Sequence, residues 1–142
     1  MSERILVPLD GSKVGEAGLR YVEALVSRLS PRAKVEVTLF HVITTLKHDV
    51  DIRAGIGAVT VPYSESELDQ MRVKAIEYLQ EVGEGLINRG ATVFFKIATG
   101  QSPAEEIIKA EEEFNVDLVA MSTHGWGGIT RWAFGSVADR VL

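Results

Sequence analysis

The residues best suited to bind a ligand are glycines and hydroxyl-bearing side chains near the carboxyl end of the sequence. Ser122 and Thr123 precede Gly125, and nine residues separate Gly125 from the pair Gly135 and Ser136. Glycine lets the backbone turn sharply and brings its N–H groups close to a ligand, and hydroxyl groups donate hydrogen bonds to phosphate oxygens. This pattern predicts a phosphate-binding loop; a tight connection from a strand to a helix is the alternative use of the same glycines.

The elements around this loop support the first interpretation. The apolar run from Asp117 to Met121 predicts a buried strand, since strands of a parallel sheet covered on both faces are continuously apolar. A helix that begins beyond the loop would add the positive end of its dipole, which favours an anion. Two common nucleotide motifs are excluded by spacing. A dinucleotide fingerprint from Gly125 requires glycine where Thr130 stands, and the chain lacks the Gly-Lys-Ser/Thr run of a Walker loop.

Composition limits the possible classes of protein. The 142 residues, of which 46% are hydrophobic and 25% charged, predict a single globular domain over residues 1–142. A net charge of −5 argues against nucleic-acid binding. The absence of cysteine excludes disulfides and thiolate metal sites. With no membrane-length apolar run and no signal peptide, we expect a cytoplasmic protein that does not bind membranes.

Apolar periodicity predicts alternating strands and helices, the pattern of a doubly wound parallel α/β sheet. Ser64 or Ser66 is predicted to cap the second helix, and Ser102 the third, with Pro103 at its first position. Glu111 and its two acidic neighbours are predicted to face solvent. The predicted strands are 4–9, 34–43, 91–98 and 117–121, and the strand 91–98 is predicted to lie at an edge of the sheet. The predicted helices start near residues 12, 64 and 103. Residues 44–63 are predicted to be irregular, and this segment would act as a lid, act as a partner-contacting arm or have no role.

Two polar residues occur inside or at the end of predicted strands. Asp10 lies where the first strand ends, which in open α/β sheets is the edge that binds ligands. Its carboxylate can accept hydrogen bonds from a ribose, or it can cap the following helix. His41 lies within the second strand with no metal-ligand spacing to other residues, so a packed, hydrogen-bonded histidine is predicted.

Four blocks of the sequence resemble successive blocks of the universal stress protein family. They are residues 5–12, 39–42, 100–107 and 118–125, and the glycine spacing resembles the family's nucleotide-binding signature, Gly-x2-Gly-x9-Gly-Ser/Thr. Ser122 stands where that signature has its first glycine. The resemblance implies a five-stranded flavodoxin-like sheet of the adenine nucleotide alpha hydrolase type, a homodimer and, in one branch, bound ATP with Mg²⁺. Family members usually end in a short apolar strand at the dimer interface, and we expect that strand to be missing from this chain.

The resemblance also implies roles for particular residues. Asp10 would contact ribose, with Pro8 and Leu9 beside it, and the Val42 backbone would pair with adenine. The remaining implied nucleotide-binding residues are Met121, Ser122, Gly125, Gly135, Ser136, Val137 and Ala138. Two further residues of the loop lie outside the signature and are added to the predicted site. Gly128 is added because its position favours a backbone contact, and His124, a general base by residue type, is expected instead to brace the loop.

Three functional classes follow. The first is a regulatory protein of the stress response that binds ATP, with little or no hydrolysis and with unknown protein partners. The second is a universal stress dimerisation module that binds no nucleotide. The third, a true nucleotide hydrolase, is disfavoured because phosphoryl transfer needs positioned cations, and the loop offers Arg131 and His124 but no P-loop lysine. No catalytic residue and no metal-binding side chain are assigned.

Overall fold

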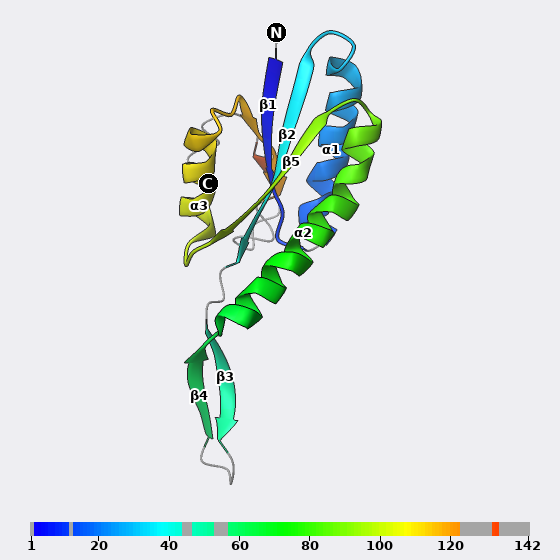
Figure 1. Cartoon of the computed structure of the whole chain (residues 1–142). Helices are drawn as coiled ribbons and strands as arrows, with labels where there is room; N and C mark the ends of the chain where they lie inside the picture. Colours follow the sequence, from blue (N-terminus) through cyan, green and yellow to red (C-terminus); the bar gives the residue numbers. More distant parts are fainter. Residues whose placement is uncertain (1, 12, 44–46, 53–56, 123–131, 134–142) are drawn as a thin grey trace.

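The computed structural model has a central parallel sheet with helices on both faces (Figure 1). It describes residues 2–11, 13–43, 47–52, 57–122 and 132–133. The main sheet has the strand order β5-β2-β1-β6, which confirms the doubly wound parallel α/β fold. The elements are β1 (Ser2–Pro8), α1 (Lys13–Leu29), β2 (Lys34–Ile43), β3 (Lys47–Ile52), β4 (Gly57–Pro62), α2 (Glu65–Asn88), β5 (Thr92–Thr99), α3 (Pro103–Glu113), β6 (Leu118–Val119), β7 (Met121–Ser122) and β8 (Trp132–Ala133).

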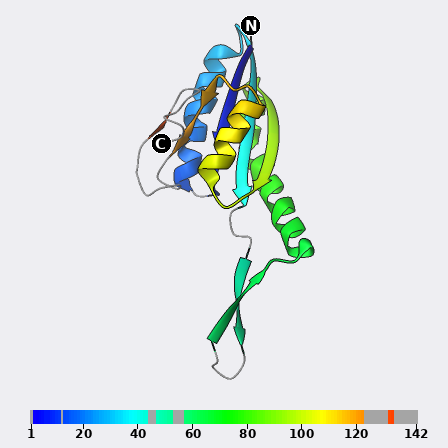
Figure 2. The same cartoon turned by 90° about the vertical axis from the view of Figure 1, so that its left-hand side faces the viewer.

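Alternating residues of the strands supply two separate cores. Ile5 and Val7 of β1 belong to the core that contains α1 and α2, whereas Leu6, between them, belongs to the core under α3. Figures 1 and 2 show α1 and α2 on one face of the sheet and α3 on the other. Successive side chains of a strand point to opposite faces, so a continuous apolar run is what two covered faces require. None of the described helices has the length and apolar character needed to cross a membrane.

The predicted strand 117–121 is divided in the structure. Asp117 fixes its start, because the Arg4 N–H donates to Asp117 Oδ2 at 2.9 Å and the Asp117 N–H donates to the Arg4 carbonyl at 2.8 Å. Leu118 and Val119 then pair with β1, and the Ala120 N–H donates to the Leu6 carbonyl at 3.0 Å. Beyond Ala120 the chain pairs in the antiparallel sense with β8, which the sequence had not predicted. The single-strand prediction was therefore wrong, because pairing with a later segment competes with extension of the main sheet.

Residues 44–63 also differ from the prediction of an irregular segment. β3 and β4 pair in register as an antiparallel hairpin, with Val50 opposite Val59. β-branched residues flank a glycine-containing connection in this stretch, which is a hairpin pattern that the sequence analysis missed. The hairpin extends away from the carboxyl end of the sheet in both views (Figures 1 and 2).

The helix caps agree with the predicted signals. The Ser64 hydroxyl accepts from the Glu67 N–H at 3.1 Å, and Glu67 Oε1 accepts from the Ser64 N–H at 3.2 Å, which completes a capping box. Ser102 caps α3, with Pro103 in its first turn. One expectation was wrong: Glu111 is only 9% exposed. It follows the buried residue Ile107 by four positions, about one helical turn, and therefore lies on the same face of α3.

The two serines at the start of α2 provide a matched test of this cap. We expect Ser64→Ala to lower the free energy of unfolding by about 1 kcal/mol, because the Glu67 N–H loses its acceptor. Ser66→Ala, in the exposed first turn of the same helix, is the control and should change stability by less than about 0.5 kcal/mol. Urea denaturation followed by circular dichroism measures both. Equal losses would show that Ser64 is not the functional cap.

Candidate functional site

The carboxyl ends of the parallel strands bring together the first part of the predicted site. Leu9, Val42 and Met121 are buried, with exposed fractions of 0%, 4% and 2%. Asp10 follows the end of β1 and is half-buried. These residues come from different parts of the sequence but lie at the edge of the sheet at which open α/β folds bind ligands.

Hydrogen bonds fix the end of β1 against β2. The Leu9 N–H donates to the Phe40 carbonyl at 2.8 Å. His41 Nδ1 lies 2.8 Å from the Leu9 carbonyl oxygen. Because a carbonyl only accepts, Nδ1 carries the proton in this contact. The prediction that His41 is a hydrogen-bonded structural residue is confirmed, and its bond holds the peptide that precedes Asp10.

The backbone of Val42 lies just beyond the end of this pairing. The ladder between β1 and β2 runs as far as Pro8 and Phe40. On the opposite side of β2, the Ile43 carbonyl accepts from the Gly100 N–H at 3.1 Å. The backbone groups of successive residues in a strand face opposite sides. Phe40 faces β1, because its carbonyl accepts from Leu9. Val42 comes two residues later, so its N–H and C=O also face the β1 side. The register gives Val42 no partner in β1.

The turn after β1 depends on glycine. Gly11 has a φ of +89°, a conformation that residues with a Cβ rarely adopt. It redirects the chain into α1 directly after Asp10, so β1 ends while β2 continues. This one turn therefore has two effects: Val42 lies beyond the last residue pair of the β1–β2 ladder, and Asp10 lies at the end of β1.

The structure adds two residues that the sequence analysis did not select. The Tyr78 hydroxyl of α2 donates to Glu16 Oε2 of α1 at 2.8 Å. Burial, the hydrogen bond to Glu16 and the negative charges of Glu16 and Asp10 raise the pKa of Tyr78 well above its ordinary value. Tyr78 and Glu16 are 62 residues apart in the sequence, and no local signal in the sequence links them.

Further predicted binding residues follow Met121 in the sequence. Ser122 is in β7, where the structure describes the backbone. The other predicted residues lie outside the described residues: His124, Gly125, Gly128, Gly135, Ser136, Val137 and Ala138. Within the described ranges, no group of three or more His, Asp or Glu side chains is arranged to hold a metal ion.

Comparison with known proteins identifies the family. The model of the universal stress protein family matches residues 1–142. The chain belongs to this family. Universal stress protein MJ0577 of Methanocaldococcus jannaschii is 29% identical over 149 residues, which cover 100% of this chain and 89% of that protein. Universal stress protein MJ0531 of the same organism is 25% identical, over 99% of this chain and 75% of its own length.

Solved structures of universal stress proteins share the fold. The structure of MJ0577 matches this universal stress protein with a TM-score of 0.65 at 27% identity, covering 98% of this chain and 87% of that one. A universal stress protein solved in complex with cAMP matches with a TM-score of 0.51 at 16% identity, covering 88% and 76%. At that identity the second match shows the fold alone.

The Tyr78–Glu16 contact predicts a pH dependence of stability. Tyr78 has a higher pKa in the folded than in the unfolded protein, whose tyrosines titrate near pH 10. The folded protein therefore binds this proton more tightly, and the stability from this group is complete below about pH 10 and is lost as the pH rises further.

We expect the free energy of unfolding of the wild type to fall more steeply above about pH 10 than that of Tyr78→Phe, which has no phenol to titrate at this position. Urea denaturation between about pH 8 and pH 11 measures the difference. Identical pH profiles for the two proteins would contradict the assigned contact.

Proposed function

We propose that this universal stress protein binds an adenine nucleotide, ATP with Mg²⁺, at the carboxyl edge of its sheet. Nucleotide occupancy would act as a regulatory signal in the stress response, read through a homodimer or through protein partners. The observation that carries the proposal is the backbone of Val42, which faces the β1 side of β2 beyond the last residue pair of the β1–β2 ladder.

Adenine recognition follows from this backbone geometry. In a strand, the N–H and C=O of one residue face the same side and present one donor and one acceptor. An adenine edge presents the complementary pair of an acceptor ring nitrogen and a donor amino group. Val42 is 4% exposed and Met121 is 2% exposed, so the base would meet an apolar surround. A base at this position would extend the β1 side of β2 in place of the strand that has ended.

Asp10 is proposed to hold the ribose. An ionised carboxylate has about four acceptor positions, so it can accept from ribose hydroxyls in addition to its contacts within the protein. Its position is fixed by the Leu9 hydrogen bonds on one side and the Gly11 turn on the other. This arrangement limits the motion of the carboxylate before ligand binds.

Phosphate binding is proposed for the glycine loop on the basis of the sequence signature. Gly125, Gly128, Gly135 and Ser136 would supply N–H and hydroxyl donors, and Mg²⁺ would be held largely by the phosphate oxygens. Another universal stress protein of this fold has been solved in complex with cAMP, an adenine nucleotide. We expect little or no hydrolysis, since the loop lacks a P-loop lysine.

The alternative is a universal stress dimerisation module without nucleotide. Ser122 favours it, because a residue with a Cβ occupies the position of the first signature glycine and restricts the backbone there. The two functions differ in the response of the protein to ATP.

Thermal unfolding with and without Mg-ATP tests the proposal. Ligand at about a hundredfold over its dissociation constant adds about 2.7 kcal/mol to the free energy of unfolding and raises the melting temperature. We expect this shift in the wild type and its loss in Gly125→Val, whose β-branched side chain would occupy the approach of the phosphate. No shift of the wild type at millimolar nucleotide would favour the module that binds no nucleotide.

A pair of aspartate variants tests the ribose contact. We expect Asp10→Ala to weaken ATP binding by about 10- to 100-fold, the usual effect of losing hydrogen bonds to a charged acceptor. Asp69→Ala on α2 is the control, because its side chain is 72% exposed and pairs with Arg72. Isothermal titration calorimetry measures both affinities. Equal affinities in the two variants would remove Asp10 from the site.

A further inference from the structure

A hollow lies on the α3 face of the sheet, toward the amino ends of the strands. Its volume is about 510 Å³, within the range of about 300–1,000 Å³ of small-molecule sites. Its lining includes Arg4 and Glu36, which are register partners near the starts of β1 and β2. The residues proposed to bind nucleotide follow the opposite ends of these strands, so the two sites are distinct.

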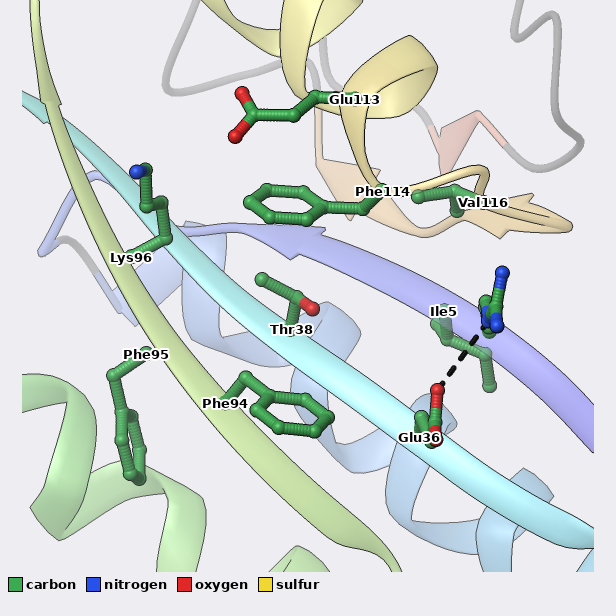
Figure 3. A pocket seen from close by; sticks show the side chains of 10 residues that line it. Ile5, Glu36, Thr38, Phe94, Phe95, Lys96, Glu113, Phe114 and Val116 are labelled. Atoms are coloured by element: carbon green, nitrogen blue, oxygen red, sulfur yellow. Dashed lines mark ion pairs between the residues drawn. The ribbon is translucent and has the colours of Figure 1, made fainter.

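Two aromatic side chains form the walls of this hollow. Phe94 comes from β5, and Phe114 caps the end of α3. Figure 3 shows their rings on either side of Thr38, while the Phe95 ring points away from the hollow. Phe94 is 49% exposed, which is unusual for so large an apolar side chain. Rings in this arrangement offer faces and edges against which a planar aromatic molecule can pack.

Thr38 supplies a polar group on the floor. It lies on β2 between the two rings and is only 9% exposed. A hydroxyl can accept a hydrogen bond from a donor on a ligand. Inside a mostly apolar pocket, a single polar group of this kind fixes the orientation of the ligand.

The charges around the hollow balance. Arg4 Nε and Glu36 Oε2 form an ion pair at 3.4 Å at one end, and Lys96 and Glu113 lie at the other end (Figure 3). Two basic and two acidic side chains therefore line the hollow and give it no net charge. Because a nucleotide or another polyanion needs a positive field, this lining favours an uncharged ligand.

We propose that this hollow, bounded by Phe94, Phe114 and Thr38, is a second binding site for a small, uncharged, planar aromatic compound that carries one hydrogen-bond donor. The rings contact the faces of the compound, and its donor bonds to the Thr38 hydroxyl. The site does not depend on nucleotide binding, so either site can fail its test without the other.

Titration of the ¹⁵N-labelled protein with indole, followed by amide chemical shifts, tests the site. Indole is planar and uncharged and has one N–H donor. We expect saturable shifts around Thr38, Phe94 and Phe114, and separate shifts around Leu9 and Val42 when Mg-ATP is added. Indole shifts that do not saturate, or that map outside the hollow, would overturn the proposal.

Variants identify the contacts. Phe94→Ala should weaken indole binding by about tenfold, as expected for loss of an aromatic partner and its area. Ile87→Ala on α2 is the control, because Ile87 is 51% exposed and does not line the hollow. Equal effects of the two substitutions would contradict the site.

Thr38→Val keeps the shape of the side chain and removes the hydroxyl, and it tests the site even if Phe94→Ala does not fold. It should weaken indole binding by about 3- to 10-fold and leave the binding of indene, which has no N–H donor, unchanged. An unchanged affinity for indole would overturn the role of Thr38 in recognition.

Discussion

The hydrogen bonds that end β1 against β2 are the constraint on which the rest of the structure depends. The Leu9 N–H bonds to the Phe40 carbonyl, and the Leu9 carbonyl accepts from His41. Directly after them, the positive φ of Gly11 turns the chain away into α1. A pairing shifted by one residue would move every side chain of β1 to the other face. It would also change which residues of β2 lie beyond the last pair of the β1–β2 ladder, and with them the backbone position of Val42.

The two cores hold this register from both sides. The three elements packed on the sheet, α1 and α2 on one face and α3 on the other, each bury apolar residues against alternate positions of β1 and β2. The bonds between Asp117 and Arg4 add a fixed start for β6 on the far edge of β1. β1 is held between β2 and β6 and between the two cores. Its carboxyl end can therefore be followed by the polar residue Asp10 at modest cost in the free energy of folding.

The same architecture places two sites of different chemistry at opposite ends of the strands. At the carboxyl ends, a peptide group and a carboxylate suit the hydrogen-bonding groups of a nucleoside. At the amino ends, α3 leaves Phe94 half-exposed, and the charges around the hollow cancel. Both sites include residues of β1 and β2, so binding at either end adds contacts to the same pair of strands. The apolar ligand and the nucleotide would therefore stabilise one framework without sharing a contact.

The sequence by itself determined the alternating order of strands and helices, the edge position of β5, a cap at Ser64 or Ser66, the cap at Ser102 and the resemblance to the family. These features depend on local periodicity and capping chemistry, which involve residues only a few positions apart. It also selected Asp10, because strand ends can be located from apolar runs, whereas Val42 and Met121 were selected from the resemblance to the family. Only the tertiary structure decided that β7 leaves the main sheet for β8, that residues 47–62 pair as a hairpin and that Glu111 is buried. The contact of Tyr78 with Glu16, and the meeting of Phe94 and Phe114 around Thr38, likewise join residues far apart in the chain. Such contacts depend on how whole elements pack against one another, which no local pattern encodes.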